Sequence, residues 1–106
     1  MKLEKLLRES VARKASDVYI TTGTKPIFRI HGELIPSEQE PVLSEEAARE
    51  YLLDLMSEAQ QKDFEANLDI DFAINIPDLA RFRVNVFLQR KGIGGIFRLI
   101  PSKIPT

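Results

Sequence analysis

The stretch ARFRVNVFLQRKGIGGIFRLI, residues 80–100, decides the fold of this chain. In its first half, apolar side chains stand at every second position, which is typical of a strand with one buried face. Residues 90–92, Arg-Lys-Gly, interrupt this alternation with a turn. Residues 93–100 then form a second apolar run, which Gly94 and Gly95 are expected to weaken. The stretch therefore predicts a β-hairpin.

The turn of this hairpin can close in two ways, which set different pairings between the strands. A loop at Arg90 and Lys91 places Arg83 opposite Arg98, whereas a loop one residue later places Arg98 opposite Asn85. In both registers Arg83 and Arg98 lie on the same face of the sheet. A β-bulge at the glycine pair would break either register.

The segments before the hairpin predict further strands and helices. Alternating apolar residues predict strands over residues 18–21, 27–31, 34–35 and 70–76. Apolar stripes at helical spacing predict a helix over residues 2–14, a second capped by Ser44, and a third from Ser57 to a left-handed stop at Asn67. The order α-β-β-β-α-α-β-β-β predicts an α+β, PAS-like fold, in which helices pack on one face of an antiparallel sheet of five to six strands.

Composition excludes several classes of function. The 106 residues include 15 Lys and Arg against 16 Asp and Glu, so the near-neutral charge gives no reason to expect nucleic-acid binding. The chain has no cysteine and a single histidine, which excludes disulfide scaffolds, thiolate nucleophiles and metal sites built on sulfur or several histidines. Its apolar runs fall far short of the roughly 20 residues that span a bilayer. We therefore expect a cytoplasmic protein.

The remaining candidates for chemistry are few. Asp69 and Asp71 lie two apart on a strand and point the same way, so with a metal they could support a small hydrolase, although no third ligand is evident. His31 stands at a hairpin tip without a partner that the sequence reveals. The glycines of residues 92–95 are not followed by a helix that could bind a phosphate at its N-terminus. We predict no catalytic residue and no metal site.

Three arginines, Arg81, Arg83 and Arg98, are more informative. Two guanidinium groups on one rigid sheet face could hold a phosphate, and like charges that face each other are unfavourable unless an anion lies between them. The alternative is that these arginines form ordinary salt bridges to Asp69, Asp71, Asp78 or helical glutamates. The residues alone leave both interpretations open.

A series of short segments resembles the PilT/PilU family of twitching-motility ATPases. These segments, in the order of the family, are ASDVYIT (residues 15–21), GTKP (23–26), RIHGEL (29–34), QKDF (61–64), DF (71–72), ARFRVNVF (80–87) and GGIFRLIP (94–101). The final residues, IPSKIPT (100–106), are similar to the linker that leads into the family's ATPase domain. Two positions depart from the pattern, since many relatives have His at Tyr19 and Asp-Gly or Asn-Gly at the turn of His31.

The resemblance implies that residues 1–100 are the PAS-like N-terminal domain of a hexameric type IV pilus retraction motor, and that residues 101–106 begin the linker to a C-terminal RecA-like ATPase domain. The implied domain is non-catalytic, packs on the ATPase domain of the neighbouring subunit, and contacts the nucleotide phosphates through Arg83 and Arg98. ATP and Mg²⁺ are the implied cofactors of the parent protein, with none in this fragment.

The implied partners are the ATPase domains of a homo-hexamer and the inner-membrane platform protein of the pilus, and the implied location is the cytoplasmic side of the inner membrane. The lack of an additional domain before residue 1 favours the retraction side of the family. The residues also leave an alternative function, a free-standing PAS-like sensor that binds a small ligand between sheet and helices.

Overall fold

Helices and strands follow one another in the predicted order, α-β-β-β-α-α-β-β-β. The computed structural model describes residues 2–101, so the predicted linker lies outside the described residues apart from Pro101. The helices are α1 (Glu4–Ala12), α2 (Glu45–Leu53) and α3 (Glu58–Asn67). The strands are β1 (Asp17–Thr21), β2 (Ile27–Ile30), β3 (Glu33–Pro36), β4 (Asp69–Ile76), β5 (Ala80–Gln89) and β6 (Gly92–Ile100).

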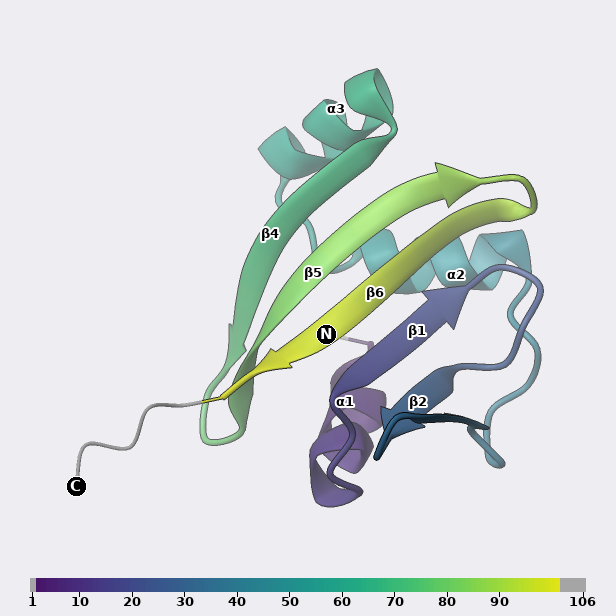
Figure 1. Ribbon diagram of the computed structural model, residues 1–106. Helices are drawn as coiled ribbons and strands as arrows, with labels where there is room; N and C mark the ends of the chain where they lie inside the picture. The colour runs from purple at the N-terminus through teal and green to yellow at the C-terminus, as the bar shows by residue number, and fades with distance from the viewer. Residues whose placement is uncertain (1, 102–106) are drawn as a thin grey trace.

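The six strands form one antiparallel sheet in the order β3-β2-β1-β6-β5-β4. The first three strands and the last three are each built from neighbours in the sequence, and the pairing of β1 with β6 joins the two blocks. Figure 1 shows α1 and α2 behind this sheet, with α3 beside β4 at one edge. The α+β class and the antiparallel sheet are confirmed, and the PAS-like assignment stays a prediction.

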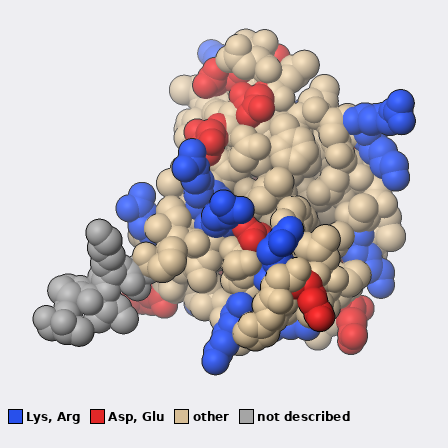
Figure 2. Space-filling view, in the orientation of Figure 1, with Lys and Arg blue, Asp and Glu red and all other residues tan. Residues whose placement is uncertain are grey.

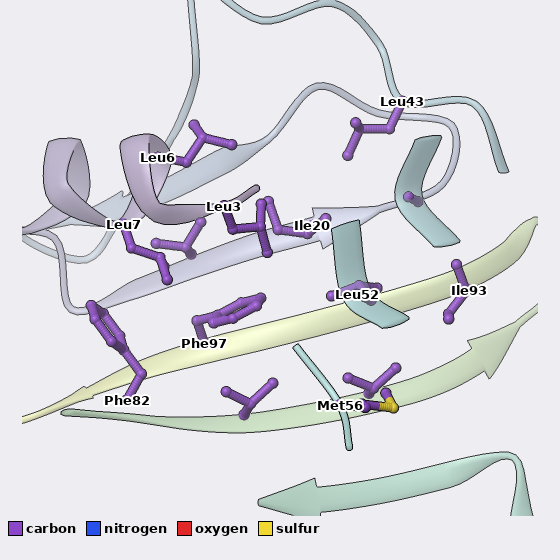
Figure 3. Close-up of a cluster of buried hydrophobic side chains, with 14 of the residues drawn as sticks. Leu3, Leu6, Leu7, Ile20, Leu43, Leu52, Met56, Phe82, Ile93 and Phe97 are labelled. Atoms are coloured by element: carbon purple, nitrogen blue, oxygen red, sulfur yellow. The ribbon is translucent and has the colours of Figure 1, made fainter. Parts of the chain in front are cut away.

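The core lies between the sheet and the helices. Alternation along the strands turns Val18 and Ile20 of β1, Phe82, Val84 and Val86 of β5, and Phe97 of β6 toward the helices, where all of them are buried. Leu3, Leu6 and Leu7 at the start of the chain and Leu52 of α2 meet these side chains (Figure 3). Each such side chain contributes roughly 1.5–3 kcal/mol when it is fully buried. Within residues 2–101, the opposite face of the sheet has no helix over it (Figure 1).

The two glycines of β6 do not disrupt the strand. Pairing with β5 runs without a bulge from Arg81 opposite Ile100 to Gln89 opposite Gly92. A Cβ atom at Gly95 would lie 2.6 Å from Cδ2 of the fully buried Leu52. Gly95 therefore lets α2 approach the sheet closely, while the expectation that it weakens the strand stays a prediction.

The helix caps follow the sequence, with two differences. Ser44 and Ser57 accept hydrogen bonds from the N3 backbone amides, and Ser57 forms a complete capping box. The first helix is shorter than predicted, because Lys14 adopts a φ of 61° just beyond it. The predicted left-handed stop at Asn67 is wrong, since Leu68 takes that conformation with φ 60°. Asn67 stays helical and donates to Asp63, and the chain enters β4 at the next position after Leu68.

Candidate functional site

The open face of the sheet carries the polar side chains of the central strands. In the observed register Arg83 of β5 lies opposite Arg98 of β6, so the hairpin closes at Arg90 and Lys91. This confirms the first of the two predicted registers. Asp17 of β1 lies opposite Arg98 on the other side, and Arg29 of β2 lies opposite Asp17. A row of three arginines and one aspartate thus crosses four neighbouring strands.

Arg83 is held from the edge strand β4. Its Nε and Nη2 atoms donate to the two carboxylate oxygens of Asp71, each at 3.2 Å. The hydrogen bonds and the charge of Asp71 raise the pKa of Arg83. The Arg83 side chain is nevertheless 68% exposed, so the guanidinium group remains within reach of a ligand. Within this chain, Arg83 therefore forms one of the salt bridges that the alternative interpretation predicts.

Arg98 is held from the opposite side by Asp17. Its Nε donates to Asp17 Oδ1 at 3.0 Å, while 73% of its side chain is exposed. Asp17 is only 4% exposed, and its other oxygen accepts a hydrogen bond from Ser16 Oγ at 2.8 Å. Arg29 Nε lies 3.7 Å from that same oxygen. A buried carboxylate needs such partners, because an unpaired charge away from water is costly.

The two arginines open onto a common pocket. This pocket has a volume of about 230 Å³ and is lined by Asp71, Arg83, Asn85, Ile96 and Arg98. Lys and Arg side chains gather over the middle of this face, with acidic side chains among them (Figure 2). Two guanidinium groups beside one concavity can donate to the oxygens of a phosphate. The third candidate, Arg81, lines a different pocket at the end of the sheet, beside Pro77, Asp78 and Pro101.

The other candidates are not brought together. Asp69 accepts a hydrogen bond from Asn85 Nδ2 at 3.0 Å, while Asp71 is engaged by Arg83. No three His, Cys, Asp or Glu side chains within residues 2–101 are grouped to hold a metal ion. His31 lies in the β2–β3 turn with φ 51°, followed by Gly32 with φ 81°. Both positive angles match the turn that Asn-Gly forms, so His31 and Gly32 adopt the same turn geometry.

One important residue of this face, Asp17, is not among the site residues predicted from the sequence. In the sequence it lies between the helix predicted over residues 2–14 and the strand predicted over residues 18–21, and its contact with Arg98 spans 81 positions along the chain. Only the pairing of β1 with β6 brings the two together. The preceding Ser16, which binds the same carboxylate, gave no separate signal.

No family model matches the chain, but individual proteins do. The type IV pilus ATPase PilU of Pseudomonas aeruginosa is 42% identical over all 106 residues, and the pilus retraction ATPase PilT of the same organism is 39% identical over the same length. A crystal structure of the pilus retraction motor PilT with bound ADP superposes on 95% of the chain with a TM-score of 0.88 and 29% identity. The chain is homologous to the N-terminal region of PilT/PilU-type pilus ATPases.

The chain spans less than a third of the length of each of these relatives. It spans 28% of the PilU protein, 30% of the PilT protein and 29% of the PilT chain in the crystal structure. The relatives are named as ATPases, and this chain corresponds only to their N-terminal part. None of the helices that the structure describes is long and apolar enough to cross a membrane.

Proposed function

We propose that this chain is the non-catalytic N-terminal domain of a hexameric type IV pilus retraction motor. In this proposal the domain packs on the ATPase domain of a neighbouring subunit and places Arg83 and Arg98 against the nucleotide phosphates bound there. The observation that carries the proposal is the shared pocket, which Arg83 and Arg98 line from adjacent strands. Each of the two arginine side chains is more than two-thirds exposed and therefore available to a partner outside the chain.

The residues fit a phosphate better than they fit a metal ion. Guanidinium groups supply planar pairs of donors, which match phosphate oxygens and repel cations. We therefore assign Mg²⁺ and the reacting atoms of ATP to the ATPase domain. Within this assignment, the arginines stabilise negative charge on the phosphates, in the manner of arginine fingers, and couple nucleotide state to movement between subunits.

The wider assembly belongs to the same proposal. The partners are the ATPase domains of identical subunits and the platform protein of the pilus in the inner membrane, with the motor on the cytoplasmic side. The similarity to PilT and PilU over the full length of the chain supports this role, because both relatives are named as pilus ATPases.

The sensor alternative has less support from the core. A ligand between sheet and helices needs a cavity with converging polar groups. That layer instead holds fully buried aromatic and aliphatic side chains, among them Phe28, Phe64, Phe82 and Phe97. The pocket that gathers charged groups lies on the open face, away from the helices.

The test is ATP turnover by the full-length parent protein with Arg83→Ala or Arg98→Ala. A true arginine finger is worth about 10³-fold or more in turnover, and we expect a smaller loss of roughly 10- to 100-fold because sensing and closure share the role. Arg→Lys should also be impaired, since an ammonium group cannot reproduce the planar pair of donors.

Arg81→Ala is the matched control, because Arg81 lies on the same strand but lines another pocket. Circular dichroism of each variant confirms that the domain is folded. Turnover equal to that of the parent in both the Arg83 and Arg98 variants would show that the phosphate contact is wrong.

A further inference from the structure

The two arginines of the pocket are held in different ways. Arg98 donates to Asp17 only through Nε, and in residues 2–101 nothing accepts a hydrogen bond from its terminal Nη atoms. Arg83 donates to Asp71 through Nε and Nη2 together, so one complete edge of its guanidinium group already faces a carboxylate. Each guanidinium group therefore keeps a pair of donors at its Nη end, but Asp71 occupies the whole Nε edge of Arg83, whereas Asp17 takes only the Nε of Arg98.

The two carboxylates also differ in where their charge lies. Asp71 lines the pocket and is 49% exposed, so an anion that enters meets a like charge at close range. Asp17 does not line the pocket, is 4% exposed, and is compensated by Arg29 and by the hydroxyl group of Ser16 as well as by Arg98. Arg29 is itself fixed by a hydrogen bond from its Nε to Tyr19 Oη at 3.2 Å. Asp17 thus forms a rigid support under Arg98, whereas Asp71 competes with a ligand for Arg83.

We propose that Asp17 is a positioning residue that holds Arg98 ready for a phosphate group, and that Asp71 is a resting counter-ion whose charge competes with the same phosphate for Arg83. The proposal rests on the phosphate contact put forward as the function of this face. The proposal predicts that removal of the Asp17 carboxylate and removal of the Asp71 carboxylate change the affinity for phosphate in opposite directions, although each neutralises an arginine of the same pocket. A merely structural role for the two ion pairs gives no such difference.

The experiment is a titration of the 106-residue chain with inorganic tripolyphosphate at low ionic strength, followed by NMR of the arginine Nε–H signals. The variants Asp17→Asn, Asp71→Asn and Asp69→Asn each remove one negative charge with little change of shape. Asp69 is the matched control, because it lies two residues from Asp71 on the same strand and binds Asn85 instead of an arginine.

From the usual strength of exposed ion pairs, we expect Asp71→Asn to bind tripolyphosphate about 2- to 5-fold more tightly than the original chain, and Asp17→Asn to bind it less tightly by a similar factor. Asp69→Asn should match the original chain. Tighter binding by Asp69→Asn to the same extent as Asp71→Asn would indicate a general effect of charge and overturn the proposal. Weaker or unchanged binding by Asp71→Asn would overturn it too.

A second measurement covers the case in which Asp17→Asn does not fold. In the original chain, the Arg98 Nε–H should stay protected from exchange when tripolyphosphate saturates the pocket, while the Arg83 Nε–H signal shifts as the phosphate competes with Asp71. Loss of protection at Arg98 on saturation would refute the positioning role of Asp17.

The variants Arg83→Ala and Arg98→Ala separate this inference from the function on which it rests. If neither weakens tripolyphosphate binding, or if the original chain does not bind it, the phosphate contact itself fails and both proposals fall. If both weaken binding while the Asp17 and Asp71 variants shift in the same direction, only the inference about the carboxylates is overturned.

Discussion

Replacement of Gly95 by alanine tests the close packing of α2 on β6. A Cβ atom at this position would lie 2.6 Å from Cδ2 and 3.3 Å from Cδ1 of Leu52, a side chain with no exposed surface. Carbon atoms do not approach so closely, so Leu52 must change its rotamer or α2 must move away from the strand. Overpacking of this kind costs about 1–3 kcal/mol, and we expect Gly95→Ala to lower the free energy of unfolding by that amount.

A double-mutant cycle with Leu52 identifies the cause of this loss. Leu52→Ala alone leaves a cavity above the strand and should cost about 2–5 kcal/mol. In the double variant the added methyl group of residue 95 enters the space that Leu52 vacates, so the combined loss should be smaller than the sum by roughly 0.5–3 kcal/mol. Urea denaturation followed by circular dichroism measures all three variants. Strictly additive losses would refute the steric argument.

Gly94 is the matched control, because it is the adjacent residue but faces the other side of the sheet. A Cβ atom there would lie 3.0 Å from Cε1 of Phe87, which is only partly buried and can turn toward solvent. We therefore expect Gly94→Ala to cost less than Gly95→Ala. An equal or larger loss would mean that the strand rejects any side chain and that Leu52 is not the reason.

The other predictions concern activity and the turns. The 106-residue chain should have no ATPase activity, and turnover that survives rigorous purification would contradict this. It should bind ATP weakly, with a Kd near or above about 1 mM, because two exposed arginines contribute little binding energy in water. Micromolar affinity by calorimetry would favour the sensor alternative. Ser57→Ala should lower the free energy of unfolding by about 1 kcal/mol, since Ser57 Oγ accepts from the Gln60 amide at 3.1 Å, and an unchanged urea midpoint would show that this cap contributes nothing. His31→Asn should leave stability unchanged or raise it slightly, because Asn tolerates the left-handed conformation that His31 adopts, and a clear loss in the same assay would contradict the assigned turn.

The local parts of the fold were predictable because their signals are local. Alternation and helical spacing depend on neighbours a few positions apart, and the order of all nine elements in the described residues follows from them. The caps at Ser44 and Ser57 were found for the same reason, since a cap is a contact within four residues. The common face of Arg83 and Arg98 also followed, because both candidate registers of one hairpin preserve it.

Tertiary structure decided what depends on strands that are distant in the sequence. The choice between two hairpin registers left the partner of Arg98 across β5 open, and the sheet settled it as Arg83. The left-handed position moved from Asn67 to Leu68 because the chain must turn directly into β4, a demand that outweighs the preference of Asn for that conformation. The sequence identifies Gly95 only as a residue that weakens a strand, and the packing of α2 shows that Leu52 leaves no room for a Cβ atom at this position.

Asp17 shows most clearly what only the tertiary structure decides. In the sequence it is one polar residue between a predicted helix and a predicted strand, and its charge gives no hint of its partner. The pairing of β1 with β6 joins, at the centre of the sheet, the strands that come first and last along the described chain, and it buries Asp17 between Arg29 and Arg98. A buried charge must find compensating groups wherever the chain supplies them, and here Arg29 is 12 residues away and Arg98 is 81 residues away. Sequence patterns report the period of a segment, whereas the neighbours of a strand are chosen by the packing of the whole sheet.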